Sequence, residues 1–110
     1  MNAPTGLGLQ RCAACGHVQY PPRACCAACL SDRLDDARAD SVPGALLART
    51  VLHHSNEARF RPRLPLGIGL VALDAGPVVV CFVPEPRAIA ARVTVSASRD
   101  GDGHTVLTAR

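Results

Sequence analysis

A chain of 110 residues has room for one domain, or for one domain with a small satellite that shares its core, which argues against two independent cores. Hydrophobic residues make up 48%, but one Tyr, two Phe and no Trp supply the aromatic surface, so we predict a modest aliphatic core. The net charge is +3 and all twelve basic residues are Arg, which excludes Schiff-base chemistry and a P-loop lysine.

Membrane and secretion signals are missing from the sequence. No stretch approaches the roughly 20 uninterrupted apolar residues of a membrane span, and the first nine residues lack the basic start and apolar run of a signal peptide. We therefore predict a cytoplasmic protein without membrane contact. In that reducing compartment, paired Cys-x-x-Cys motifs favour metal binding, with two disulfides as the alternative.

The N-terminal part of the chain is organised around cysteines. Residues 7–9 alternate Leu and Gly, which predicts a short strand leading into Cys12. One Cys-x-x-Cys motif ends at Cys15, and a second, from Cys26 to Cys29, follows after ten residues. Each motif can form a knuckle that offers two thiolates, so the pair predicts a closed tetrahedral site for one metal ion per chain. Zinc is the default metal, and iron in a rubredoxin-like site is the alternative.

Three residues beside these motifs need an interpretation. Cys25 adjoins Cys26, but a knuckle from Cys25 to Cys29 would be looser, so Cys26 is predicted as the ligand and Cys25 as a bystander or an occasional substitute. His17 is interpreted as a surface residue or as one that supports the site from outside, with replacement of one thiolate ligand as the alternative. Gly16 directly follows the first knuckle, where we expect the backbone to need a positive φ.

The pattern of the remaining residues predicts mainly strands. Residues 32–40 are polar and predict a linker or a single helical turn, and after Pro43-Gly44 short apolar runs alternate with Gly, Pro and Asp. The predicted strands are residues 45–54, 66–73, 78–83, 88–98 and 104–108. Residues 74–77 predict a hairpin connection, and residues 100–103 predict a turn. Five strands with little helix indicate a small β-barrel or sandwich.

A catalytic centre is not evident. His54 adjoins Ser55, but sequence neighbours seldom form a catalytic pair in space, and no GxSxG motif, Gly-rich phosphate loop or paired-carboxylate motif occurs. We therefore predict no catalytic residue. The pair His53 and His54 is expected to end a strand and face solvent, with metal binding or action as a base as the alternative.

That basic loop is the densest cluster of charge in the chain. Three arginines surround one aromatic residue, and guanidinium groups suit a phosphate-bearing ligand such as the nucleotide end of coenzyme A, while Phe60 would cover an adenine or an acyl chain. A solvated loop without a ligand is the alternative. The candidate ligand-binding residues are His53, His54, Arg59, Phe60, Arg61 and Arg63.

These motifs resemble a known family. The string from Arg11-Cys12 through Tyr20-Pro21-Pro22-Arg23 to Cys29-Leu30-Ser31, followed by a β-rich half, is similar to the acyl-CoA-associated OB-fold proteins with an N-terminal rubredoxin-like zinc ribbon. The resemblance implies a mainly β chain with a zinc ribbon over residues 1–40 and a five-stranded OB-fold barrel over residues 41–110. Members generally carry a helical segment before the ribbon, and we expect any contact made by that helix to be missing from the eleven residues before Cys12.

The resemblance also implies a function. It predicts a non-catalytic accessory subunit of an acyltransferase-type or thiolase-type enzyme complex, which binds a thiolase-like or hydratase-like partner and supports the binding or channelling of acyl-CoA. Two other functions stay open. A single-stranded nucleic-acid-binding module is disfavoured by three aromatics and a charge of only +3, and a rubredoxin-like electron carrier requires iron.

Overall fold

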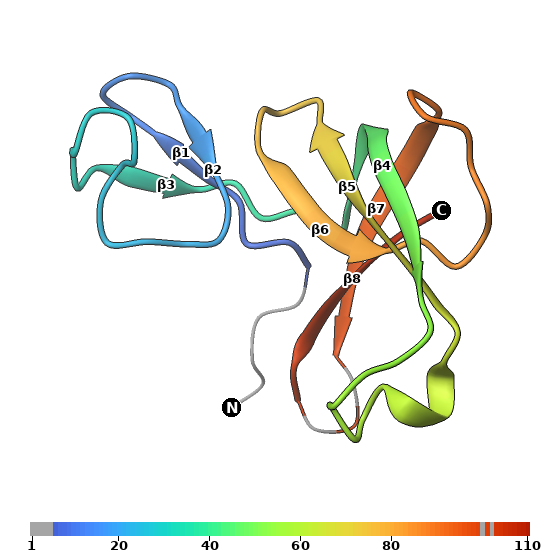
Figure 1. Ribbon diagram of the computed structural model, residues 1–110. Helices are drawn as coiled ribbons and strands as arrows, with labels where there is room; N and C mark the ends of the chain where they lie inside the picture. The colour runs from blue at the N-terminus through green and yellow to red at the C-terminus, as the bar shows by residue number, and fades with distance from the viewer. Residues whose placement is uncertain (1–5, 100, 102) are drawn as a thin grey trace.

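The computed structural model describes residues 6–99, 101 and 103–110, and in these residues it contains a small three-stranded sheet followed by a closed five-stranded barrel (Figure 1). The small sheet consists of β1 (Gln10–Cys12), β2 (Val18–Gln19) and β3 (Leu34–Asp36). The barrel consists of β4 (Ser41–Leu52), β5 (Leu66–Leu73), β6 (Val78–Phe82), β7 (Arg92–Arg99) and β8 (Thr105–Ala109), with the 3-10 helix η1 (Arg61–Arg63) between β4 and β5. The predicted mainly β fold is confirmed.

The small sheet differs from the prediction in its third strand. β1 lies in the centre and pairs antiparallel with β2 and β3, so Arg11 lies opposite both Val18 and Asp35. The predicted linker or helical turn at residues 32–40 is therefore wrong over its middle, because this segment hydrogen-bonds to the edge of β1 that would otherwise be unpaired. The strand expected at residues 7–9 is limited to a bridge between Leu7 and Ala39.

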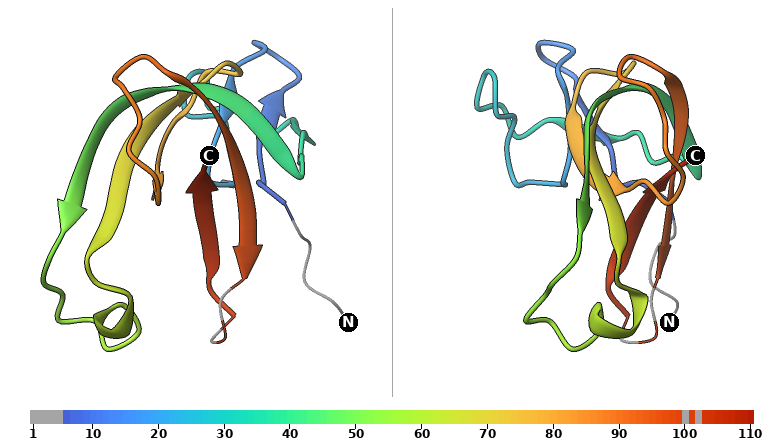
Figure 2. Two further views of the ribbon diagram at one scale, coloured as in Figure 1. Left: turned by 90° about the vertical axis from the view of Figure 1, so that its right-hand side faces the viewer. Right: turned by 45° about the vertical axis from the view of Figure 1, so that its right-hand side comes forward.

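The barrel has the strand order of an OB-fold, β4-β5-β6-β8-β7, with β4 closing the ring onto β7. All neighbouring strands are antiparallel except β6 and β8, which run parallel and share the single pair Phe82 and Thr108. Figure 2 shows how the long β4 curves across the barrel, which lets its first half pair with β7 and most of its length pair with β5. In the part of the chain described, no helix is long and apolar enough to cross a membrane.

β4 begins earlier than predicted and contains a proline. The start was expected at residue 45, after Pro43, but β4 begins at Ser41. Pro43 lies opposite Thr94, whose backbone exchanges both of its hydrogen bonds with Arg110 instead (2.9 and 3.0 Å). The proline therefore removes no N–H that β7 needs, which is the setting in which a strand tolerates proline.

The other barrel strands fall close to their predicted bounds. β5 coincides with the expected residues 66–73, while β7 begins at Arg92 rather than residue 88 because residues 84–91 form a proline-containing loop. In that loop Ala90 has a φ of 71° and donates its N–H to the Leu46 carbonyl. Of the turn predicted at residues 100–103, residues 100 and 102 lie outside the described residues.

One hydrophobic core joins the two sheets. Its fully buried side chains include Leu46, Val71, Val83 and Val95 of the barrel segment, and Leu7 reaches the same cluster from the N-terminal segment. Leu9 and Val18 also belong to this cluster. The ribbon is therefore packed against the barrel, and the division into domains at residues 1–40 and 41–110, of which the first five lie outside the described residues, stays a prediction.

Candidate metal centre and ligand cleft

The four cysteines predicted as ligands come together at one end of the small sheet. Their Sγ atoms all lie within 4.8 Å of one another. Cys12 Sγ is 3.6 Å from Cys29 Sγ, and Cys15 Sγ is 3.6 Å from Cys26 Sγ. A tetrahedral zinc site with bonds of about 2.3 Å places its sulfurs about 3.8 Å apart, so the arrangement fits a four-thiolate zinc ion. All six cysteines are free thiols, which does not support the disulfide alternative.

The two knuckles have the same backbone geometry. In the first, the N–H of Gly16 donates to the Cys12 carbonyl (2.9 Å), and in the second the N–H of Leu30 donates to the Cys26 carbonyl (2.9 Å). Gly16 has a φ of 81°, as the sequence predicts, and Leu30 occupies the equivalent position with a φ of 67°. The residue after each second cysteine therefore takes the left-handed conformation, which costs glycine little and leucine more.

The four thiols interact too closely to ionise independently. Backbone N–H groups, first that of Cys15, lower the pKa of Cys12 to about 6. The N–H of Ser31 acts in the same direction on Cys29, but hydrogen bonds with the Cys12 and Cys15 thiols outweigh it and raise the pKa of Cys29 to about 12. Four thiolates at this spacing require a cation to hold their charge, and a divalent zinc ion satisfies that condition.

The neighbouring Cys and His residues lie outside this cluster. Among the described residues, Cys25 and His17 are exposed and do not join the four-cysteine group. Cys81 is buried in β6, where burial raises the pKa of its thiol to about 11, so it is an inert core residue. The structure thus brings together the four cysteines that the spacing selected.

Two glutamines that the sequence reasoning missed hold the ribbon together. The side chain of Gln19, which is 5% exposed, donates to the Cys25 carbonyl (3.2 Å) and accepts from the Ala27 N–H (2.8 Å), so it fixes the second knuckle. Gln10 accepts from the Arg23 N–H (2.9 Å) and from Gln19 (2.9 Å). A glutamine in such short strands carries no periodic signal, so the pattern alone gave no indication of this role.

A cleft of about 430 Å³ opens on the barrel between β6 and β8. The two strands diverge from their single shared pair, and the gap is bordered by β6, by residues 105–107 of β8, by Tyr20 of the ribbon and by the loop between β4 and β5. OB-folds bind ligands on the face of their second and third strands, near the loops that join the first two and the last two strands. The cleft lies at that position, since β5 and β6 are the second and third strands of the barrel.

Every Phe and Tyr side chain of the protein lines this cleft. Phe60 and Phe82 pack edge to face, with ring centroids 5.7 Å apart, and Tyr20 lies on the same lining. The guanidinium of Arg59 lies 4.6 Å from the Phe60 centroid, and that of Arg63 lies 4.9 Å from the Phe82 centroid. The cleft therefore combines flat apolar walls with positive charge at one end.

The structure divides the candidate ligand-binding residues into three groups. Arg59 and Phe60 line the cleft, and Arg63 covers Phe82. Arg61 instead holds its own loop, because it donates to the backbone carbonyls of Ser55 (3.3 Å) and Asn56 (3.2 Å). The two histidines at positions 53 and 54 are exposed and do not line the cleft. Ligand binding by these residues stays a prediction.

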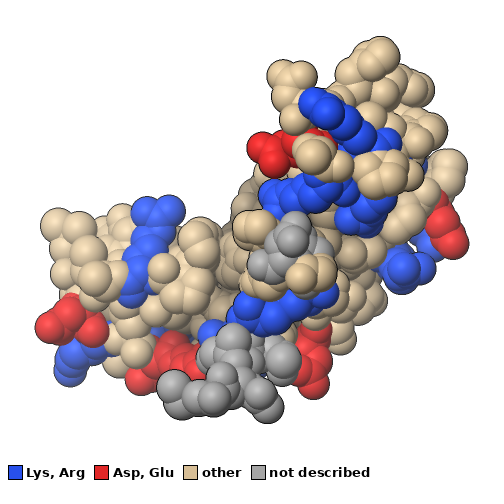
Figure 3. All heavy atoms as spheres, turned by 90° about the horizontal axis from the view of Figure 1, so that it is seen from below, with Lys and Arg blue, Asp and Glu red and all other residues tan. Residues whose placement is uncertain are grey.

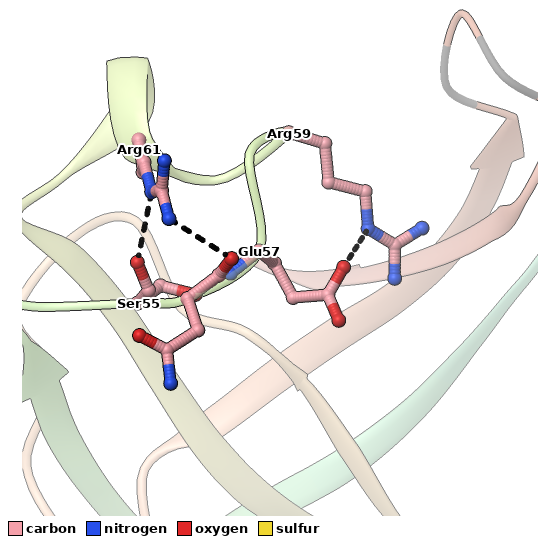
Figure 4. A network of polar contacts seen from close by, with 5 residues as sticks. Ser55, Glu57, Arg59 and Arg61 are labelled. Atoms are coloured by element: carbon pink, nitrogen blue, oxygen red, sulfur yellow. Dashed lines mark hydrogen bonds and ion pairs between the residues drawn. The ribbon is translucent and has the colours of Figure 1, made fainter.

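The basic loop contains one acidic residue, Glu57, which lies beside Arg59. Figure 4 shows Arg61 turned toward the loop carbonyls and Glu57 turned toward Arg59, with Glu57 Oε2 4.0 Å from Arg59 Nε. In Figure 3, which views the molecule from below, basic atoms gather on the barrel, while acidic atoms are fewer and lie at its margins. This end of the barrel therefore presents a positive surface.

Comparison with known proteins finds a family match for the ribbon and a structural match that covers both the ribbon and the barrel. Residues 7–35 match the family described as ChsH2, rubredoxin-like zinc ribbon domain. Among solved structures, the chain matches one described as "Ltp2-ChsH2(DUF35) aldolase" with a TM-score of 0.72 and 28% sequence identity, over 93% of this chain and 81% of that one. A comparison with curated proteins found no significant match. The resemblance predicted from the sequence is confirmed: this chain carries a ChsH2-type rubredoxin-like zinc ribbon at residues 7–35 and continues into an OB-type barrel.

Proposed function

We propose that this protein is a non-catalytic accessory subunit of an acyl-CoA-processing complex, where it binds a thiolase-like or hydratase-like partner and helps to hold acyl-CoA. The observation that carries the proposal is the structural match over 93% of the chain, because the matched structure is described as an aldolase in which a ChsH2(DUF35) chain is named together with Ltp2. A ribbon and a barrel that share one core are a rigid unit suited to docking.

The metal centre supports a structural role for the ribbon. Four thiolates fill the coordination sphere of a zinc ion and leave no position for water or substrate, so such a site stabilises a fold rather than activating a reactant. The zinc would hold the knuckle that follows Tyr20, and Tyr20 lines the cleft. In this proposal the metal shapes one wall of the ligand site and takes no part in the reaction.

The cleft supports an acyl-CoA ligand. Its aromatic and aliphatic walls suit an acyl chain or an adenine ring, and Arg59 at one end suits a phosphate group. A volume of about 430 Å³ holds part of an acyl-CoA molecule and leaves the remainder to a second protein. An accessory subunit that contributes one wall of a shared site fits this geometry.

Native co-purification tests the proposal. The tagged protein is isolated from its own cell, and the intact complex is weighed with its metal and ligand retained. We expect a larger thiolase-like or hydratase-like chain together with one zinc ion per copy of this protein. Persistent isolation as a lone chain without such a partner would contradict the function, and a red iron-containing sample would favour the electron carrier instead.

Changing Phe60 tests the ligand cleft. We expect Phe60→Ala to weaken the binding of an acyl-CoA to the purified complex about tenfold, because the ring packs against Phe82 and forms one wall of the cleft. Isothermal titration measures the affinity. Arg87→Ala is the control, since Arg87 pairs with Glu85 in the loop of residues 84–91 and does not line the cleft. Equal losses in both variants would contradict a ligand site at Phe60.

A nucleic-acid ligand is the second candidate, favoured by one observation. The three aromatic side chains all line a cleft on the ligand-binding face of an OB-type barrel, and bases stack on such rings. A single-stranded oligonucleotide that binds at low micromolar concentration, with an affinity that falls steeply as salt rises, would favour this candidate. We expect no such binding, since the chain offers only three aromatic residues and a net charge of +3.

A further inference from the structure

The outer face of β5 and β6 is apolar along its whole length. Buried and exposed residues alternate in both strands, and the outward positions form three cross-strand pairs. These pairs are Ile68 with Phe82, Leu70 with Val80, and Ala72 with Val78. Neither strand contains a charged residue, whereas the water-exposed face of an antiparallel sheet is normally polar. An apolar face of this kind marks a contact site.

The exposure of this face is substantial. Val80 is 66% exposed, Val78 is 54% exposed and Leu70 is 39% exposed. Beside them a shallow hollow of about 260 Å³ extends the face onto β4, where Ala48 and Thr50 form its far side. The hollow has room for a bulky apolar side chain from another protein, so the face combines a flat apolar surface with a small binding pocket.

The charges at the two ends of this face determine what fits it. At the Phe82 end, Arg59 is paired with Glu57, while the guanidinium of Arg63 lies over the Phe82 ring and supplies positive charge beside the face. At the opposite end, Asp74 in the β5–β6 turn is bound by both terminal guanidinium nitrogens of Arg92, and this contact holds the pKa of Asp74 below its ordinary value. A second copy placed antiparallel on the face would need Asp74 to meet Arg63, and Asp74 is already bound to Arg92. A complementary surface must therefore supply a carboxylate of its own opposite Arg63.

We propose that the outer face of β5 and β6 is the docking surface for the partner subunit, and that the partner presents a bulky apolar side chain to the hollow and a carboxylate opposite Arg63. This inference rests on the proposed function and deepens it. Ile68, Val80 and Phe82 belong both to this face and to the lining of the cleft. The docked partner therefore closes the mouth of the cleft, and the ligand lies between two chains.

Charge placed on this face tests the docking surface. The variants Val80→Asp and Leu70→Asp are titrated against the thiolase-like or hydratase-like chain that co-purifies with the wild type. We expect the Kd to rise about 30-fold or more for each, because an unpaired carboxylate is forced into an apolar contact. Ile89→Asp is the matched control, since Ile89 is 61% exposed in the loop of residues 84–91 and should change the Kd less than about threefold.

Further measurements separate the possible failures. Unchanged zinc content and melting temperature show that the variants fold, and hydrogen exchange on the wild-type complex, which needs no variant, should show protection of β5 and β6. If the partner co-purifies but Val80→Asp and Leu70→Asp bind it as the wild type does, the docking surface is wrong and the proposed function stands. If no thiolase-like or hydratase-like chain co-purifies with this protein, the docking surface and the proposed function are both wrong. A dimer of this chain alone that Val80→Asp dissociates would overturn the proposal in favour of a second copy.

Discussion

Cys26→Ser will release the metal and unfold the ribbon, whereas Cys25→Ser will leave both intact. The Cys26 thiol lies in the four-sulfur cluster and is buried, while the adjacent Cys25 thiol is exposed and outside it. Binding of structural zinc contributes roughly 10–16 kcal/mol to the folding of small metal domains. The strands of the small sheet are only two or three residues long, so they cannot hold the ribbon without the ion.

The metal content of the two variants decides this prediction. Elemental analysis should find one zinc ion per chain in the wild type and in Cys25→Ser, and little or none in Cys26→Ser. Circular dichroism should show that Cys26→Ser loses strand signal, and a strong chelator should reproduce that loss in the wild type. If Cys25→Ser loses the metal and Cys26→Ser retains it, the second knuckle begins one residue earlier than the structure indicates.

The effect should reach the barrel as well. Leu7, Leu9 and Val18 come from the ribbon segment and belong to the core that the barrel strands fill. Unfolding the ribbon therefore exposes part of the barrel interior and removes Tyr20 from the cleft. We expect the metal-free protein to lose ligand affinity together with its ribbon, although no cysteine of the cluster touches the cleft.

The metal centre was predictable because the residues that form it are close together in the sequence. Two Cys-x-x-Cys motifs carry their geometry in four residues each, and Gly16 marks the left-handed position that closes the first knuckle. The second knuckle carries no such mark, because Leu30 occupies the same conformation there. β5 was equally clear from its apolar run, which Pro65 precedes and Asp74 ends.

The features that were missed depend on contacts between distant segments. β2 and β3 are too short to show a period and exist because β1 offers them two edges. The early start of β4 depends on a pairing at Pro43 that only the complete barrel provides. The cleft assembles Tyr20, Phe60 and Phe82 from the ribbon, a loop and a strand, so the sequence contains these aromatics without indicating that they meet.

A methyl group at one glycine should have the largest effect on the barrel itself. Gly67 lies in β5 opposite Val51, and a Cβ there would collide with the Val83 carbonyl oxygen and with the guanidinium of Arg49. Arg49 donates to that same carbonyl through Nε (3.2 Å) and Nη2 (3.0 Å), and the Val83 N–H donates back to the Gly67 carbonyl (2.9 Å). The added methyl group therefore pushes Val83 away from Gly67 at the end of the β5–β6 ladder. It also displaces the Arg49 side chain, which donates to the Val83 carbonyl.

We expect Gly67→Ala to lower the free energy of unfolding by about 3 kcal/mol, since it adds overpacking to a broken hydrogen bond. Denaturant unfolding measures the loss, and Gly101→Ala is the control because a Cβ at Gly101 meets nothing within 4 Å and the φ of Gly101 lies outside the left-handed region. That control should be neutral or stabilise by up to about 1 kcal/mol. A Gly67→Ala variant as stable as the control would mean that Arg49 and Val83 separate without cost, and the face of β5 and β6 would then be too pliable for the docking surface proposed above.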